Sequence, residues 1–270
     1  MTSVAQHLNT STYMQKNKKI SNYLSKKFEN DGYIIVKHFV NKNQKDKLLN
    51  EIIIATKKNN KKLFDYGMVH NCFLHGKSLL NLLKLKKLRS YCDELLCDNS
   101  IIYAYQSSSI PPNGTNYGSR IHKDTPRFIK NYMTNLGFIL SLTEFNSLNG
   151  PTEILPGSHK INKKPSSFDF EKNKKIIQLD SGDAIFFNAN LWHRAGQNKS
   201  DLWRYAITIN FCRPYMRSRF DFPRLIKNHK LDIPNNNSLK KFLNFDVRIP
   251  TSLSEFYLPN NKRLYKPNQE

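Results

Sequence analysis

Two short motifs place side chains of metal-binding type at separate points of the chain. His122 and Asp124 stand in RIHKD, and His193 stands in LWHRAG after the apolar run AIFFNAN. We predict a strand at 119–125, in which alternation directs His122 and Asp124 to the same face. Each motif alone is a weak signal, because an H-x-D triplet is also common as a surface pair. A histidine after an apolar strand is often simply a core residue.

Together the three residues form a set of two imidazoles and one carboxylate. Such a facial set leaves open positions on Fe(II) for a cosubstrate and dioxygen. Structural zinc prefers a closed tetrahedron with more cysteine or histidine ligands. The residue types therefore favour an iron site at His122, Asp124 and His193 over a structural zinc site.

A fourth candidate is Arg204, which follows His193 after a short predicted loop. We predict strands at 190–195 and 204–212. If these strands are neighbours, Arg204 lies beside the strand of His193, deeper in the protein. A buried guanidinium needs an anion, and its planar fork matches a carboxylate through two hydrogen bonds. The alternative is an exposed arginine in a basic protein.

The segments that must position these residues change character along the chain. We expect helices at 18–30, 43–58 and 79–97, with a strand, YIIVKHFV, after the first. A region of short strands separated by Gly and Pro turns follows. These predicted strands are 101–109, 119–125, 133–142, 152–155, 175–180, 183–188, 190–195 and 204–212. The pattern predicts a mainly β protein with a helical buttress, built as a double-sheet jelly roll.

The domain organisation follows from these elements. We expect a flexible N-terminus at 1–17 and one domain at 18–270. That domain consists of a helical region at 18–100, a jelly-roll core at 101–212 and a C-terminal extension at 213–270 folded over the barrel.

Five stretches resemble, in order, motifs of the phytanoyl-CoA dioxygenase (PhyH-like) family of Fe(II)/2-oxoglutarate oxygenases. They are DGYIIVKHF, RIHKD, LNGPTEILPGSHK, GDAIFFNANLWHRAGQN and WRYAITINFCRP. The likeness covers residues 28–220, and it is specific as an ordered set. It implies a cupin-like double-stranded β-helix, Fe(II) ligation by His122, Asp124 and His193, and anchoring of 2-oxoglutarate by Arg204.

The resemblance also implies the reaction, which consumes dioxygen and 2-oxoglutarate and releases succinate and carbon dioxide. Hydroxylation of a small or medium-sized metabolite is the expected outcome, with desaturation or cyclisation as alternatives. Asp124 favours oxygenation, because related halogenases carry a small residue there. Some relatives have a hydroxyl residue two positions after the second histidine. Ala195 cannot supply that hydroxyl, and Thr208 is a candidate substitute. His159, in PGSHK, is expected to be structural.

The net charge of +22 raises the question of a nucleic-acid partner. Most of the excess is lysine dispersed along the chain beside abundant Asn and Ile, so A/T-rich codon usage explains much of it. We expect no nucleic-acid binding. The densest arginine cluster consists of Arg213, Arg217, Arg219 and Arg224. It is either a clamp for an anionic substrate group or a solvated set that pairs with Asp221.

The remaining expectations concern location and class. None of the four cysteines forms a C-x-x-C pair, so free thiols in a reducing compartment are expected. The sequence shows no apolar signal segment and no run of membrane-spanning length. These features predict a cytoplasmic protein without a membrane partner and leave its oligomeric state open. A non-catalytic jelly-roll binding module remains the rival from another functional class.

Overall fold

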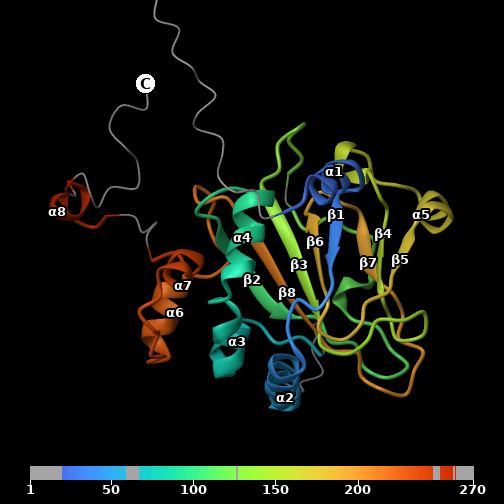
Figure 1. The fold of residues 1–270 in the computed structure, drawn as a ribbon, viewed down its shortest axis with the longest axis horizontal. Helices are drawn as coiled ribbons and strands as arrows, with labels where there is room; N and C mark the ends of the chain where they lie inside the picture. The colour runs from blue at the N-terminus through green and yellow to red at the C-terminus, as the bar shows by residue number, and fades with distance from the viewer. Residues whose placement is uncertain (1–19, 59–66, 126, 246–249, 258, 260–270) are drawn as a thin grey trace, which may run out of the picture.

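A computed structural model describes residues 20–58, 67–125, 127–245, 250–257 and 259 (Figure 1). The N-terminus predicted to be flexible, at 1–17, lies outside this part of the chain.

Two antiparallel sheets form the centre of the described structure. The five-stranded sheet has the order β1 (Tyr33–Val36), β6 (Ala184–Asn188), β3 (Asn135–Ser141), β8 (Ala206–Cys212) and β2 (Ile101–Ser107). The three-stranded sheet has the order β5 (Lys175–Ile177), β4 (Thr152–Ile154) and β7 (His193–Ala195). Strands that follow one another in sequence change sheets at β3–β4, β5–β6, β6–β7 and β7–β8. This crossing pattern is that of a jelly roll and confirms the predicted fold class.

Helices flank the two sheets (Figure 1). The α-helices are α1 (Asn22–Asp31), α2 (Lys42–Lys58), α3 (Lys77–Leu82), α4 (Lys86–Leu95), α5 (Ser167–Asn173), α6 (Phe222–Asn228), α7 (Asn237–Phe242) and α8 (Leu253–Phe256). Short 3-10 helices occur at η1 (Cys72–Leu74), η2 (Tyr117–Ser119) and η3 (Ser158–Lys160). No helix within the described residues is long and apolar enough to cross a membrane.

Alternation along the strands divides the apolar side chains between two cores. On β6, Phe186 belongs to the core shared with the helices, whereas Ile185 and Phe187 belong to the core between the sheets. The helices therefore bury one face of the large sheet. The opposite face of that sheet and the small sheet enclose the interior of the barrel.

The structure differs from the predicted helix at 79–97, which is broken into α3 and α4. Leu85 is extended, with φ −64° and ψ 117°, so the chain turns there. Both Leu79 and Leu88 are fully buried in the same core as a result. A leucine-rich sequence without Gly or Pro gave no signal for this turn.

The segment after β8 packs on the helical side of the large sheet. Phe242 of α7 contacts Phe211 of β8, with ring centroids 5.0 Å apart. Phe222 of α6 contacts Phe73 in the same way, at 5.6 Å. Helices α6 and α7 therefore extend the helical layer.

Candidate active site

Backbone pairing brings the two histidines together. The predicted strand at 119–125 does not form, because η2 and a single bridge residue occupy that segment. His122 pairs with His193 at the start of β7, and each backbone N–H donates to the other's carbonyl at 3.0 Å. Directly opposed residues carry their side chains on one face. The imidazole centroids are accordingly 4.3 Å apart.

Both imidazoles have the same orientation towards the backbone. Nδ1 of His122 lies 2.6 Å from the carbonyl oxygen of Arg120, and Nδ1 of His193 lies 3.0 Å from that of Leu191. A carbonyl oxygen can only accept, so each Nδ1 must carry the proton. The lone pair of each ring is thereby placed on Nε2, the atom left to bind a metal.

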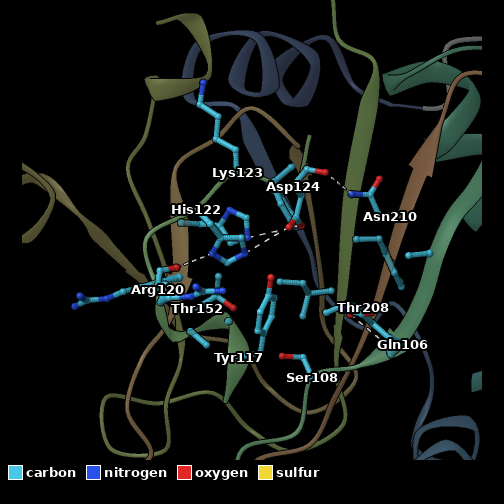
Figure 2. A pocket seen from close by; sticks show the side chains of 18 of the residues that line it. Gln106, Ser108, Tyr117, Arg120, His122, Lys123, Asp124, Thr152, Thr208 and Asn210 are labelled. Atoms are coloured by element: carbon cyan, nitrogen blue, oxygen red, sulfur yellow. Dashed lines mark hydrogen bonds and ion pairs between the residues drawn. The ribbon is translucent and has the colours of Figure 1, made fainter. Parts of the chain in front are cut away.

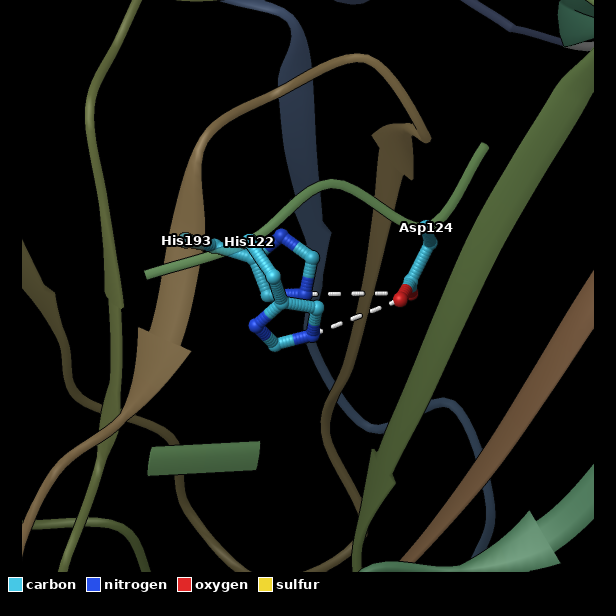
Figure 3. A group of neighbouring side chains, drawn as sticks. All are labelled: His122, Asp124 and His193. Atoms are coloured by element: carbon cyan, nitrogen blue, oxygen red, sulfur yellow. Dashed lines mark ion pairs between the residues drawn. The ribbon is translucent and has the colours of Figure 1, made fainter. Parts of the chain in front are cut away.

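Asp124 completes the group in Figure 3. Its Oδ1 lies 3.4 Å from Nε2 of His122, and its Oδ2 lies 3.7 Å from Nε2 of His193. One ligand atom from each of the three residues lies within 4.8 Å of the others. Ligands about 2 Å from one ion, at right angles, lie about 3 Å apart. The three side chains therefore fit one metal ion after a small contraction.

The backbone of Asp124 is fixed on both sides. Its N–H donates to the carbonyl of Ala189 at 2.9 Å, and its carbonyl accepts from Nδ2 of Asn210 at 3.0 Å. Asn210 in turn accepts from Nδ2 of the fully buried Asn135 at 2.9 Å. Strands β3 and β8 thus hold the carboxylate in place although no strand contains it.

The protonation states of Asp124 and His193 suit a divalent cation, whereas Asp124 outweighs the effect of burial and raises the pKa of His122. Burial opposes the charge on Asp124, but His193 and His122 outweigh it and hold the pKa of the carboxyl at about 2. Burial and the neighbouring His122 lower the pKa of His193 to about 4. At neutral pH Asp124 is therefore an anion and His193 offers a free lone pair.

An aromatic wall supports His193 from inside the barrel. The ring of Phe187 meets the imidazole edge-on, with centroids 4.9 Å apart. Phe187 can lie there because its partner in the sheet is Gly137. A Cβ atom at residue 137 would be 2.2 Å from the phenyl ring. The absence of a side chain at Gly137 is therefore a requirement of the site.

The PGSHK loop holds the backbone next to His193. Ser158, in the PGSHK loop, accepts the Trp192 N–H on its hydroxyl at 3.0 Å, one residue before His193. The ring of His159 points away to the Glu29 carbonyl, 3.2 Å from Nε2, and His159 is not in the metal-binding group. The loop is thus structural, and it orients β7.

Arg204 reaches the site from the other sheet. It precedes β8, which lies between β3 and β2, whereas β7 pairs with β4. The expectation that Arg204 lies beside the strand of His193 is therefore wrong, because the chain crosses between sheets after β7. Arg204 instead pairs with Ile110 and donates from Nη1 to the Ser108 carbonyl at 2.9 Å.

The guanidinium of Arg204 is buried without a counter-charge. The residue is 1% exposed, and its Nε has no hydrogen-bond partner. Its cationic group lies over the Phe145 ring at 4.5 Å. Burial lowers the pKa of Arg204 to about 9. A buried cation in this state requires an anion, and the donors still available suit a carboxylate.

One cavity of about 550 Å³ joins the metal-binding group to Arg204. Figure 2 shows the Tyr117 hydroxyl directed towards His122 and Asp124, and Thr152 below His122. Thr208 also lines the cavity, but its hydroxyl donates to the Gln106 carbonyl at 3.2 Å.

Thr152 is a cavity residue that sequence reasoning missed, and its hydroxyl could serve 2-oxoglutarate in place of the one that Ala195 lacks. It is directly opposite Ala195 in the β4–β7 pair, and no residue of the described chain hydrogen-bonds to its hydroxyl. Alternation could have found it, since Ile154 on the same face of β4 belongs to the inter-sheet core.

The outer face of the small sheet is held by an ion-pair cluster. Glu153 of β4 accepts from Nε of Arg194 at 2.7 Å and from Nζ of Lys174 at 2.9 Å. Glu171 of α5 binds the same arginine at 2.6 Å. Arg194 follows His193 directly, so this cluster fixes the register of the strand that carries the second histidine.

The predicted arginine cluster does not converge. Arg213 donates to the Met133 carbonyl at 2.8 Å and lies over the Tyr132 ring. Asp221 caps α6 by accepting the backbone N–H of Arg224. Of the four arginines, only Arg219 lines the cavity.

A jelly roll with two imidazoles and a carboxylate at one mouth of the barrel defines a class, the non-haem iron oxygenases. Known structures share the architecture. The chain resembles a crystal structure of the epimerase SnoN in complex with Fe³⁺, alpha ketoglutarate (2-oxoglutarate) and nogalamycin RO, with a TM-score of 0.62, 17% identity, and coverage of 79% of this chain and 90% of that one. It resembles the non-heme alpha ketoglutarate dependent carbocyclase SnoK from nogalamycin biosynthesis with a TM-score of 0.62, 15% identity, and coverage of 77% and 91%. At these identities the likeness establishes the fold.

Sequence comparison identifies the family. The chain is 26% identical over 210 residues to an uncharacterized protein of Mycobacterium tuberculosis, which covers 76% of this chain and 77% of that protein. The phytanoyl-CoA dioxygenase (PhyH) family model matches residues 28–206, and the chain belongs to this family. It is therefore an enzyme of the Fe(II)/2-oxoglutarate oxygenase superfamily that acts on a small molecule, and the binding-module alternative is set aside.

Proposed function

We propose that this enzyme hydroxylates a small or medium-sized metabolite and converts 2-oxoglutarate to succinate and carbon dioxide. His122, Asp124 and His193 ligate Fe(II), and Arg204 binds the distal carboxylate of 2-oxoglutarate. The observation that carries this assignment is the shared cavity. It contains two imidazoles whose Nε2 atoms face one carboxylate, and a buried guanidinium without a counter-anion.

Each side chain has a distinct task in this proposal. When bound, the iron and 2-oxoglutarate activate dioxygen for attack on a C–H bond. The Arg120 and Leu191 carbonyls orient the imidazoles. Arg204 fixes one end of 2-oxoglutarate by charge and by its planar fork. Phe187 and Ile139 line the inner wall and exclude water from the reacting atoms.

Asp124 supports oxygen transfer over halogen transfer. Its carboxylate would be the third protein ligand of the metal, which would leave no vacant anion site there for halide. We expect chloride-containing buffer to yield no chlorinated product.

A second outcome at the same site is desaturation or ring closure. The solved structures that share this fold include proteins described as a carbocyclase and an epimerase, which indicates that the scaffold accommodates more than hydroxylation. The placement of the substrate relative to the metal would decide between these outcomes.

Turnover against a metabolite panel tests the proposal. Purified protein with Fe(II), ascorbate and 2-oxoglutarate is incubated with each compound, and succinate and product masses are recorded. Hydroxylation predicts substrate-stimulated succinate release and a product with one added oxygen atom. Products that lose two hydrogen atoms would indicate desaturation or ring closure. Failure of the wild-type protein to bind 2-oxoglutarate would refute the function itself.

A further inference from the structure

The cavity carries more positive charge than its cofactors balance. Its lining includes the six basic residues Arg120, Lys123, Lys164, Arg194, Arg204 and Arg219, and Asp124 is the only carboxylate among the described lining residues. A divalent metal and dianionic 2-oxoglutarate cancel each other. The ion pairs of Arg194 with Glu153 and Glu171 neutralise that residue. A net positive field therefore remains where the substrate enters, and such a field favours anions.

Lys123 and Lys164 are poorly placed to use this field. Lys123 extends away from Asp124 (Figure 2), and its ammonium lies over the Trp192 ring at 5.0 Å. Lys164 lies on the segment before α5, and both Lys164 and Arg219 are exposed. The Arg120 guanidinium lies over the Tyr117 ring at 4.8 Å, so Arg219 remains as a cation on a separate element, the segment that follows β8.

The backbone of Arg219 is anchored at an irregularity in β2. The register with β8 shifts between Ile102 and Ala104, at Tyr103. The Tyr103 carbonyl accepts the Arg219 N–H at 2.9 Å, and the adjacent Ser218 hydroxyl donates to the Ile102 carbonyl at 2.7 Å. Bulges beside active sites commonly redirect side chains. Here the irregularity fixes the backbone from which Arg219 reaches the cavity.

Arg219 makes no hydrogen bond or ion pair with a carboxylate among the described residues. Its charge does reach the site, because it acts with His193 and His122, against the effect of burial, to lower the pKa of Asp124. Tyr103 and Met68 line the same cavity and are half-buried, so they offer apolar surface beside the guanidinium. This combination fits a ligand with one anionic group and one apolar part.

We infer that Arg219 binds an anionic group of the substrate, so that the substrate class is an organic carboxylate or phosphate with an apolar body. This inference rests on the proposed function. It assigns Arg204 to 2-oxoglutarate and Arg219 to the substrate. Arg204 precedes β8 and Arg219 follows it, so the two cations stand beyond opposite ends of that strand.

Matched probes test the inference by equilibrium binding. Protein loaded with Mn(II) and 2-oxoglutarate is titrated calorimetrically with octanoate against octanamide, and with phenyl phosphate against phenol. We expect at least one anion to bind roughly tenfold or more tightly than its neutral partner, as a charged hydrogen bond would give. The Arg219→Gln variant should lose that preference. The Arg217→Gln variant should retain it, because Arg217 is exposed like Arg219 but lies outside the cavity.

Two controls separate the possible failures. Retained 2-oxoglutarate affinity shows that Arg219→Gln is folded, and Arg219→Lys, which keeps the charge, should recover part of the preference. An equal preference in the wild type and Arg219→Gln overturns the inference, as does wild-type protein that binds 2-oxoglutarate but neither anion more tightly than its neutral partner. If the wild type fails to bind 2-oxoglutarate, the proposed function falls as well.

Discussion

Replacement of Arg204 by alanine tests the cosubstrate site most sharply. The side chain is 1% exposed, its Nε is without a partner, and the only protein hydrogen bond of its guanidinium among the described residues is to the Ser108 carbonyl. The variant should therefore lose 2-oxoglutarate affinity while the metal-binding group, on different elements, stays intact.

The magnitude follows from burial. Truncation of one partner of a buried, hydrogen-bonded charge pair costs about 2–5 kcal/mol. A second guanidinium nitrogen would also donate a charged hydrogen bond to 2-oxoglutarate. We therefore expect Arg204→Ala to lose about 3 kcal/mol of binding free energy, which is roughly a hundredfold in Kd. Calorimetric titration of the Mn(II)-loaded protein measures it. Arg204→Lys should recover little, because an ammonium lacks the planar fork.

Stability provides an independent readout for the same residue. Replacement of an uncompensated buried charge by an apolar side chain of similar size is often neutral or stabilising. Arg204→Met should therefore melt at an equal or higher temperature than the wild type without 2-oxoglutarate, and it should lose the stabilisation that 2-oxoglutarate gives. An unchanged Kd in Arg204→Ala would refute the assignment, and Arg120, which lines the same cavity, would become the candidate anchor.

Three further predictions concern the walls of the site. His193→Ala should lower Fe(II) affinity by roughly a hundredfold or more, whereas His159→Ala should leave metal content unchanged when both are measured by metal analysis after dialysis. Thr152→Val should weaken 2-oxoglutarate binding about five- to tenfold through loss of one hydrogen bond. Adding Ala195→Ser to that variant should restore part of the affinity. A double variant that binds no more tightly than Thr152→Val would show that a hydroxyl at 195 cannot replace the one at 152. Gly137→Ala should destabilise the protein by about 1–3 kcal/mol in denaturant unfolding, because the new methyl group overlaps the facing phenyl ring.

The sequence allowed prediction of which three residues come together as possible metal ligands, because that chemistry is carried by residue type. His122, Asp124 and His193 come together as expected, but the reason given for two of them was wrong. His122 and Asp124 face one side because of a bridge to His193 and a hydrogen bond from Asn210, without a strand. Strand alternation correctly placed the two side chains on one face, but the strand on which that prediction relied does not form.

The remaining errors concern contacts between residues that are far apart in the sequence. The chain passes from one sheet to the other between β7 and β8, and nothing in the local sequence indicates this change. The prediction therefore placed Arg204 beside the wrong strand. The role of Thr152 depends on its partner in the register, Ala195, and that pairing is visible only in three dimensions. The choice of Arg219 from four arginines likewise depends on a backbone irregularity in β2, at a distance in the chain.

Oxygen labelling of succinate tests the central claim most directly. Wild-type protein is supplied with Fe(II), ascorbate, 2-oxoglutarate and labelled dioxygen, and succinate is analysed by mass spectrometry. The proposed site predicts succinate that carries one labelled oxygen atom, and its loss in both His193→Ala and Asp124→Ala. Unlabelled succinate from the wild type, or labelled succinate at the wild-type rate from either variant, would contradict the assignment of the reaction to this site.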